Sequence, residues 1–331
     1  MKKLTKKIKI NLTMLLMITV AMGMLPAQNS NLFKVEKEIS AAAIQATEVN
    51  TISFTVQIGG QQLYIVEKDV AYDTPFPDFR LFNDGSGVLI DAFEASLTFY
   101  NASGDEIVLI NILKEKTIDY ERSVYSAIAG GTLVIALHEP GMDELQFQHY
   151  NKKGQFLDQC KVSEKHLNGI SLSENENIIA LSVYDWQQDL LNKSTLFLDK
   201  SGRQLSRIQA GFIRGSFSDE EDLFIGYSNR DCFIYDFSDR TVHFRKSSPK
   251  NMMILEAQLY RDEIIIIESE KPVLKSGSWN YKNPRLERYD LNGRLLSKTR
   301  IVSKTFSEYE LQSTHEGLIF RTGNTSQQLV K

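Results

Sequence analysis

A polar turn followed by an apolar run recurs six times in this chain, and this repeat constrains the fold more than any other feature. The apolar runs begin at Val88, Thr132, Ile178, Leu223, Ile264 and Leu318. Successive starts are therefore 44, 46, 45, 41 and 54 residues apart. A regular spacing of this length indicates that the chain uses one structural unit repeatedly.

The residues of the repeat indicate that each unit is a set of β-strands. Glycine, asparagine and aspartate at the turns supply the backbone angles that tight hairpins need. The runs that follow are nearly continuous in apolar residues, as in strands buried on both faces, and the later strands alternate more. A four-stranded propeller blade takes about 40–50 residues. We therefore expect an all-β protein, a β-propeller of six blades.

Two segments that precede the first copy bear on the blade count and on how the ring closes. Residues 51–57 form a strand that has no neighbour in the repeat. We expect this strand to pair with the last blade, which would close the ring and remove exposed edges. Residues 62–66 form a further strand, which belongs either to the first of six blades or to an incomplete seventh. Seven blades therefore stay possible.

The second turn of the unit carries a resemblance to known proteins. It ends the segments LTFYNASG (97–104), FQHYNKKG (147–154), TLFLDKSG (195–202), FIYDFSD (233–239) and LERYDLNG (286–293). These segments resemble the repeats of bacterial secreted β-propeller proteins with six or seven blades. The Gly-His and Trp-Asp pairs of WD40 repeats are missing. The resemblance implies the architecture and brings no catalytic residue with it, because no catalytic motif is matched.

The N-terminus has the pattern of a secretory signal peptide. Five lysines within residues 2–9 precede an apolar stretch over residues 12–25, and Pro26 and Ala27 follow. The stretch is shorter than the roughly 20 residues that span a bilayer, so cleavage is expected rather than anchoring. We predict a signal peptide over 1–27, a linker over 28–50 and one propeller domain over 51–331. The protein is then secreted or periplasmic, and meets a membrane only if the signal is uncleaved.

Charge and cysteine content limit the classes of partner. Without the signal, 33 basic residues face 42 acidic ones, a net charge of −9. Nucleic-acid binding is not expected, because it depends on clustered Lys and Arg. Cys160 and Cys232 fall on different units, so we expect two free, buried thiols rather than a disulfide. A monomer is expected.

The connections between second and third strands suggest a binding face. Three of them are long, over residues 136–145, 184–194 and 268–285, and the crossover over 69–80 joins the same face. These segments carry the candidate binding residues Trp186, Trp279, Tyr281, Tyr184 and Phe76. Exposed tryptophan and tyrosine suit binding hot spots and sugar stacking. The alternative interpretation is that each aromatic side chain folds back over its own blade.

No motif in the sequence indicates catalysis or metal binding. The five histidines are scattered and form no HExxH pair, and no Gly-x-Ser-x-Gly elbow is present. The exception would be His138, if the fold brings it together with acidic residues of other blades near the axial channel. The acidic run 218–222 lacks the calcium-binding EF-hand pattern and occupies a hairpin turn. We therefore predict no catalytic residue, no metal ligand and no cofactor.

Three functions remain compatible with this sequence. The leading hypothesis is a non-catalytic propeller that binds a protein, peptide or glycan partner through its long-loop face. The alternative is a hydrolase or lyase that acts on a polysaccharide or small ester at the mouth of the channel, with carboxylates from different blades as acid and base. The third is a passive structural component of the cell envelope.

Overall fold

A computed structural model describes residues 33–44, 47–58, 60–71, 77–113, 123–138, 144–164, 166–187, 190–275, 278–302, 305–307, 309–314, 317–322 and 325–330. The regular structure of these residues is entirely β-strand. No helix among them is long and apolar enough to cross a membrane. The predicted signal peptide lies outside the described residues.

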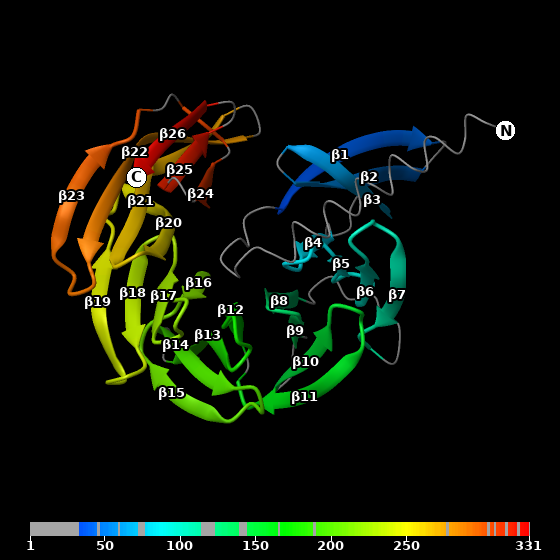
Figure 1. Cartoon of the computed structure of the whole chain (residues 1–331), viewed down its shortest axis with the longest axis horizontal. Helices are drawn as coiled ribbons and strands as arrows, with labels where there is room; N and C mark the ends of the chain where they lie inside the picture. Colours follow the sequence, from blue (N-terminus) through cyan, green and yellow to red (C-terminus); the bar gives the residue numbers. More distant parts are fainter. Residues whose placement is uncertain are drawn as a thin grey trace, which may run out of the picture.

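The strands form seven antiparallel sheets arranged in a ring, and the chain passes through them in order (Figure 1). We call the sheets blades 1 to 7. Blade 1 contains β1 (Phe33–Ile44), β2 (Thr47–Ile58) and β3 (Gln61–Ala71), and blade 7 contains β24 (Glu310–Thr314), β25 (Gly317–Thr322) and β26 (Thr325–Val330). The five blades between them have four strands each.

Blade 2 contains β4 (Asp78–Leu81), β5 (Gly87–Asp91), β6 (Ser96–Tyr100) and β7 (Glu106–Asn111), and blade 3 contains β8 (Ser123–Ala129), β9 (Thr132–His138), β10 (Leu145–Asn151) and β11 (Phe156–Val162). Blade 4 contains β12 (Leu167–Leu172), β13 (Ile178–Gln187), β14 (Leu190–Asp199) and β15 (Gln204–Ile208). Blade 5 contains β16 (Arg214–Phe217), β17 (Leu223–Tyr227), β18 (Asp231–Asp236) and β19 (Thr241–Ser247), and blade 6 contains β20 (Met252–Tyr260), β21 (Glu263–Lys275), β22 (Ser278–Asp290) and β23 (Leu295–Arg300).

The all-β propeller expected from the repeat is confirmed. Each of the six predicted apolar runs is the second strand of a blade, in β5, β9, β13, β17, β21 and β25. The second turn also has the expected geometry, because Gly104, Gly154, Gly202 and Gly293 all adopt positive φ angles between 75° and 83°. The sequence favoured six blades and left seven open; the described strands form seven sheets.

The core consists of apolar side chains packed between successive blades. Phe99 of blade 2 packs with Leu133 and Tyr150 of blade 3 in one buried cluster. An aromatic cluster joins blades 4 and 5, where the ring of Phe197 lies 4.6 Å from that of Tyr235, centroid to centroid, and stacks on it. Because each cluster holds two neighbouring sheets face to face, the hydrophobic effect stabilises the ring blade by blade.

The predicted closure of the ring is not found among the described strands. Residues 51–57 lie in β2, the central strand of blade 1, which pairs with β1 on one edge and with β3 on the other. The strand therefore has no free edge for blade 7. Its partner β1 lies within residues 28–50, so part of the predicted linker is a strand of blade 1. The buried side chains of blade 1, such as Phe54, pack against Phe79 of blade 2.

Alternating strand direction gives the ring two distinct faces. In blades 2 to 6 the first strands lie nearest the centre and the fourth strands form the rim (Figure 1). One face carries the starts of the first and third strands and the ends of the second strands, and we call it the loop face. The opposite face carries the turns between first and second strands and between third and fourth strands, and we call it the turn face.

Candidate functional site

Two hairpins on the loop face extend far beyond the other strands of their blades. Strands β13 and β14 have 10 residues each, and β21 and β22 have 13 residues each. The sequence predicted loops over 184–194 and 268–285; most of both segments is instead paired β-strand. Backbone hydrogen bonds between paired strands therefore hold these segments in place.

The two hairpins pair tryptophan with leucine near their tips. Trp186 is opposite Leu191 in the β13–β14 pairing, and Leu274 is opposite Trp279 in the β21–β22 pairing. On the longer hairpin, Val273, Leu274 and Trp279 have 58%, 57% and 55% of their surface exposed. Large apolar side chains exposed together on a protein surface mark an interaction site more often than scattered ones do.

The base of the β21–β22 hairpin is fixed by an aromatic cluster. Tyr281 stacks on Phe306 with ring centroids 5.5 Å apart, and the two residues exchange backbone hydrogen bonds of 2.7 and 3.2 Å. Tyr281 also meets Tyr309 edge to face at 5.5 Å. Tyr309 lies just before β24, so these contacts attach the hairpin of blade 6 to blade 7. Tyr281, a predicted binding residue, is half-buried and supports the hairpin.

A polar cluster lies beside the first strands of blades 5 and 6, where the loop face meets the axis. The hydroxyl of Tyr227, at the end of β17, donates to Oε1 of Glu256 on β20. Arg214 begins β16 opposite Tyr227, and its Nη1 lies 3.6 Å from Oε2 of Glu256. The hydroxyl of Tyr309 donates to the backbone oxygen of Leu255 at 3.2 Å. Side chains from three blades therefore converge here.

Burial dominates the electrostatics of this cluster. Desolvation raises the pKa of Glu256 above its usual range, although the Tyr227 hydroxyl and the Arg214 guanidinium oppose the rise. Desolvation and the adjacent Glu256 raise the pKa of Tyr227 strongly. Burial lowers the pKa of Arg214, but Tyr227 and Glu256 outweigh it and the net shift is upward. Perturbed titratable groups of this kind concentrate at functional sites, although structural ion pairs also produce them.

A second group of rings lies on the loop face of blades 3 and 4. His166, just before β12, stacks on Tyr184 of β13 with centroids 5.0 Å apart. The backbone N–H of Tyr184 donates to the oxygen of His166 at 3.1 Å. Burial, and then the neighbouring Tyr184, raise the pKa of Tyr125 on β8. Tyr184 is therefore half-buried and packs on His166 beside the start of β12.

The five predicted binding residues are thus in different situations. Trp279 is on the exposed tip, whereas Tyr281 and Tyr184 are packed against neighbours. Phe76 and the side chains of Trp186 and His138 lie outside the described residues. Sequence reasoning missed Arg214, Tyr227 and Glu256. Arg214 and Glu256 are one repeat apart, but no local motif marks them, because successive blades place them side by side.

One group within the described part of the chain has the composition of a metal site. Asp236, Asp239 and His243 each place a ligand atom within 4.8 Å of the others at the β18–β19 turn. Nε2 of His243 lies 2.6 Å from Oδ2 of Asp239 and 3.4 Å from Oδ2 of Asp236. Asp239 and His243 are exposed and already satisfy one another by hydrogen bonding. Hydrogen bonding within the turn therefore accounts for the close approach of these three side chains without a metal ion.

Comparisons with known proteins show the fold alone. No family model and no curated protein sequence matches this chain. Among solved structures, the Dos1 propeller has a TM-score of 0.57 at 9% identity and covers 85% of this chain and 73% of its own. A chain of the mitotic checkpoint complex has a TM-score of 0.55 at 9% identity, and the match covers 92% of this chain and 93% of that one. Hydrazine synthase from Kuenenia stuttgartiensis has a TM-score of 0.52 at 12% identity, and the match covers 76% of this chain and 75% of that one. Such neighbours support the β-propeller and leave function to the site, because one fold hosts many functions.

Proposed function

We propose that this protein is an exported, non-catalytic β-propeller that binds a protein partner through its loop face. The observation that carries the proposal is the exposed apolar tip formed by Val273, Leu274 and Trp279 on the β21–β22 hairpin. Interface hot spots are enriched in tryptophan. The two aliphatic side chains beside Trp279 favour a protein or peptide over a glycan, whose hydroxyl groups they would not satisfy.

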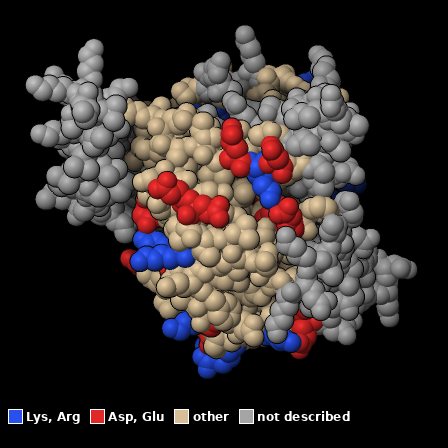
Figure 2. All heavy atoms as spheres, turned by 90° about the vertical axis from the view of Figure 1, so that its right-hand side faces the viewer, with Lys and Arg blue, Asp and Glu red and all other residues tan. Residues whose placement is uncertain are grey.

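The charges below the tip are of both signs. Lys271 and Lys282 are exposed on the same hairpin, and Glu270 lies directly opposite Lys282 in the strand pairing. The partner surface should therefore be recognised mainly through an apolar patch that meets Val273, Leu274 and Trp279, with mixed charge at its rim. On the side of the molecule seen in Figure 2, acidic and basic side chains are interspersed over a mostly uncharged surface. On the hairpin itself, the exposed apolar tip is the feature that distinguishes it from such a mixed surface.

Site-specific photocrosslinking in the native host envelope tests this proposal. A photoreactive residue replaces Leu274, and a control copy carries it at Lys153 on the turn face. We expect one discrete crosslinked protein from position 274 and none from position 153. Trp279→Ala should weaken the purified complex about 30-fold, the effect of losing one hot-spot side chain. Its unfolding should change little, because the side chain is half exposed.

The opposite results would refute the loop face as the binding surface. Equal crosslinking from both positions would indicate non-specific contact. An unchanged dissociation constant for Trp279→Ala and for Trp186→Ala would move the binding site away from both hairpins. Export is tested separately by fractionation of the host, in which the processed protein should lack residues 1–27.

One observation favours the hydrolase or lyase as a second candidate. Glu256 is largely buried at the channel mouth with a raised pKa, as a general acid requires, and Tyr227 and Arg214 are in contact with it. If this cluster is catalytic, a screen of polysaccharides and small esters should find a turnover that Glu256→Gln abolishes. A turnover that survives Glu256→Gln would exclude this cluster as its source.

A further inference from the structure

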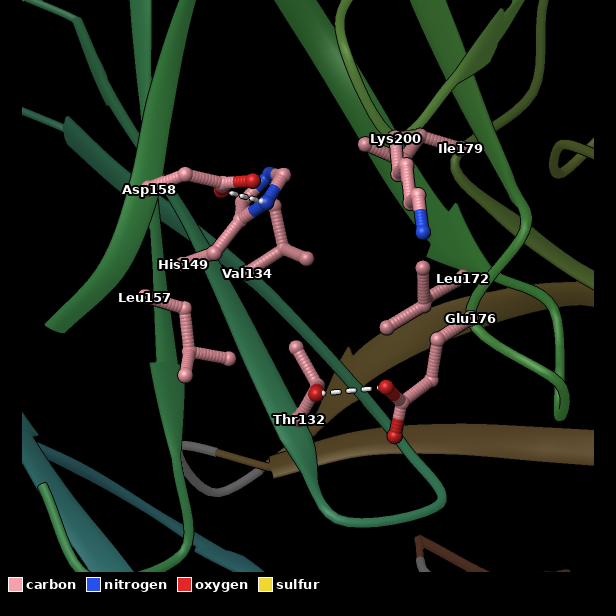
Figure 3. Close-up of a pocket in the computed structure, with 9 residues that line it drawn as sticks. All are labelled: Thr132, Val134, His149, Leu157, Asp158, Leu172, Glu176, Ile179 and Lys200. Carbon is pink, nitrogen blue, oxygen red and sulfur yellow. Dashed lines mark hydrogen bonds and ion pairs between the residues drawn. The ribbon is translucent and has the colours of Figure 1, made fainter. Parts of the chain in front are cut away.

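A pocket opens on the turn face at the seam between blades 3 and 4, far from the loop face. Its volume is about 230 Å³. Blade 3 supplies His149 and Asp158 to one wall, and blade 4 supplies Glu176 and Lys200 to the other (Figure 3). Aliphatic side chains such as Leu157 and Leu172 line the space between them. A seam between rigid sheets suits a preformed small-molecule site.

His149 is the most unusual group in this pocket. Its side chain is 6% exposed, and Nδ1 lies 2.5 Å from Oδ1 of Asp158. Nε2 is buried and has no hydrogen-bond partner within the described structure. Burial lowers the pKa of His149, more than the Asp158 carboxylate raises it. The ring is therefore neutral at pH 7, with Nδ1–H donating to Asp158 and Nε2 presenting a lone pair. A buried acceptor left unsatisfied is costly, so the pocket lacks one hydrogen-bond donor.

Glu176 on the opposite wall is fixed in place and also accepts hydrogen bonds. Its Oε1 accepts from the backbone N–H of Gly131 at 2.9 Å, and its Oε2 accepts from the hydroxyl of Thr132 at 2.7 Å. The residue adopts a φ of 62°, which is unfavourable for a side chain of this kind. A carboxylate has about four lone-pair sites, so Glu176 retains acceptor capacity after these two bonds. Both walls therefore offer acceptors to a donor-rich ligand.

Lys200 supplies the complementary positive charge. It lies in the turn between β14 and β15, and Figure 3 shows its ammonium group pointing into the space between the two walls. Within the described part of the chain it has no carboxylate partner. A flexible lysine that points into a pocket without an ion pair can bind an anionic ligand group.

We propose that this pocket binds a small polyhydroxy carboxylate, up to the size of a hexuronic acid. The ligand carboxylate pairs with Lys200, one hydroxyl donates to Nε2 of His149, and a second donates to Glu176. The carbon skeleton lies against Leu157 and Leu172. This site is independent of the loop face, so the propeller would carry a small-molecule site on one face and a protein-binding site on the other.

Titration of the full mature chain with D-glycerate, D-gluconate and D-glucuronate tests the proposal. With the protein labelled with ¹⁵N-histidine, we expect saturable movement of the His149 Nε2 resonance with at least one probe below about 10 mM. Lys200→Met should weaken that binding about tenfold or more, whereas Lys153→Met, at an exposed lysine on the same face, should not. Trp279→Ala should leave it unchanged, which separates this site from the proposed function.

Two outcomes would overturn the proposal. One is the absence of saturable movement of the His149 resonance with all three probes, which would mean that only water fills the pocket. The other is equal binding by the wild-type chain and Lys200→Met, which would place any bound probe elsewhere. The wild-type spectrum needs no variant, so a folding defect in Lys200→Met would not leave the proposal undecided.

Discussion

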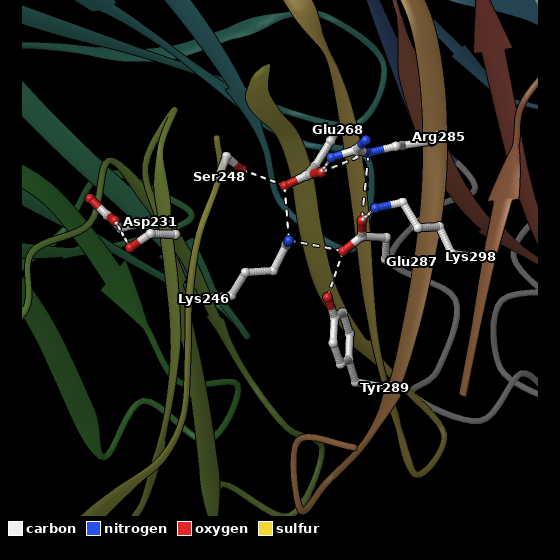
Figure 4. A network of polar contacts seen from close by, with 9 residues as sticks. Asp231, Lys246, Ser248, Glu268, Arg285, Glu287, Tyr289 and Lys298 are labelled. Atoms are coloured by element: carbon white, nitrogen blue, oxygen red, sulfur yellow. Dashed lines mark hydrogen bonds and ion pairs between the residues drawn. The ribbon is translucent and has the colours of Figure 1, made fainter. Parts of the chain in front are cut away.

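Glu268 is expected to be among the most stabilising polar side chains of the protein. It is fully buried on β21, at the seam between blades 5 and 6 (Figure 4). Its Oε2 accepts from Nε and Nη2 of Arg285 at 2.9 and 2.6 Å. Its Oε1 accepts from the hydroxyl of Ser248 and lies 3.1 Å from Nζ of Lys246. The carboxylate therefore joins two strands of blade 6 to the end of blade 5.

Glu268→Ala would leave Arg285 without its main buried counter-charge and Lys246 with one of its two. Glu287 compensates in part, because it is 2.9 Å from Lys246 and 3.5 Å from Arg285. Removing one partner of a buried ion pair costs about 3–5 kcal/mol. At an m-value of about 3 kcal/mol/M, this loss lowers the urea midpoint by about 1–1.7 M. Glu268→Gln keeps the shape and one acceptor, so its loss should be smaller than that of Glu268→Ala.

Urea denaturation followed by circular dichroism and by tryptophan fluorescence measures these shifts, and coincident curves would justify a two-state treatment. The matched control is Glu263→Ala. Glu263 binds Arg288 through two contacts of 2.7 Å, but both side chains are partly exposed. Its loss should cost about 1 kcal/mol or less. If Glu268→Ala is no more destabilising than Glu263→Ala, the inference that burial makes this network decisive is wrong.

Three further predictions concern groups in the core. Burial alone would raise the pKa of Glu287, but Lys298, Tyr289 and Lys246 outweigh it and lower that pKa from 4.5 to about 2. The free energy of unfolding should therefore fall by about 3 kcal/mol as the pH drops from 4.5 to 2. Acid unfolding of Glu287→Gln should lack most of this pH dependence. Burial, followed by the charges of Asp158 and Asp199, raises the pKa of Cys160 to about 11. At pH 8 its thiolate fraction, and hence its rate of labelling by a thiol reagent, should be about 100-fold below that of an ordinary thiol. Equal labelling rates of the native and the unfolded protein would contradict this. A Cβ at Gly226 would lie 2.5 Å from Phe233 and 3.0 Å from Phe224, so Gly226→Ala should cost about 1–3 kcal/mol in the same urea assay, and an unchanged midpoint would show that these rings shift freely.

The sequence repeat predicted the second and third strands because local chemistry fixes them. In the third-to-fourth-strand turns, for example, the Asn101 side chain accepts from the backbone N–H of Ser103 at 2.8 Å and of Asp105 at 2.9 Å, and Gly104 then adopts a φ of 83°. Asp199 makes the same contacts with Ser201 and Arg203. Such turns are encoded within five residues and are therefore visible in the sequence.

The strands that the sequence did not predict depend on distant partners. Strand β1 contains the alanine-rich segment 40–43, which has little strand preference of its own; its pairing with β2 along all twelve residues makes it a strand. The β21–β22 extension contains Pro272, which favours a loop over a paired strand. The register of this hairpin shifts between Glu270 and Val273, so the proline lies where pairing is interrupted.

The candidate site was only partly visible for the same physical reason. Trp279 could be chosen from the sequence because an aromatic residue in a long connection is a local signal. Arg214, Tyr227 and Glu256 are ordinary strand residues, and only the curvature of the ring brings them together. The His149 pocket likewise needs two blades in contact. A sequence pattern reports what one strand or turn requires, and it does not report what neighbouring blades place opposite one another.

The two faces of the ring therefore differ in how freely their sequence can change. Every blade must reverse direction at the turn face, so asparagine, aspartate and glycine recur there for structural reasons. The chain also reverses between second and third strands at the loop face, but the length of this connection varies: β13–β14 and β21–β22 are long hairpins, whereas β17 ends at Tyr227 and β18 begins at Asp231. Residues that depart from the repeat on the loop face are thus better candidates for function than residues that conform to it.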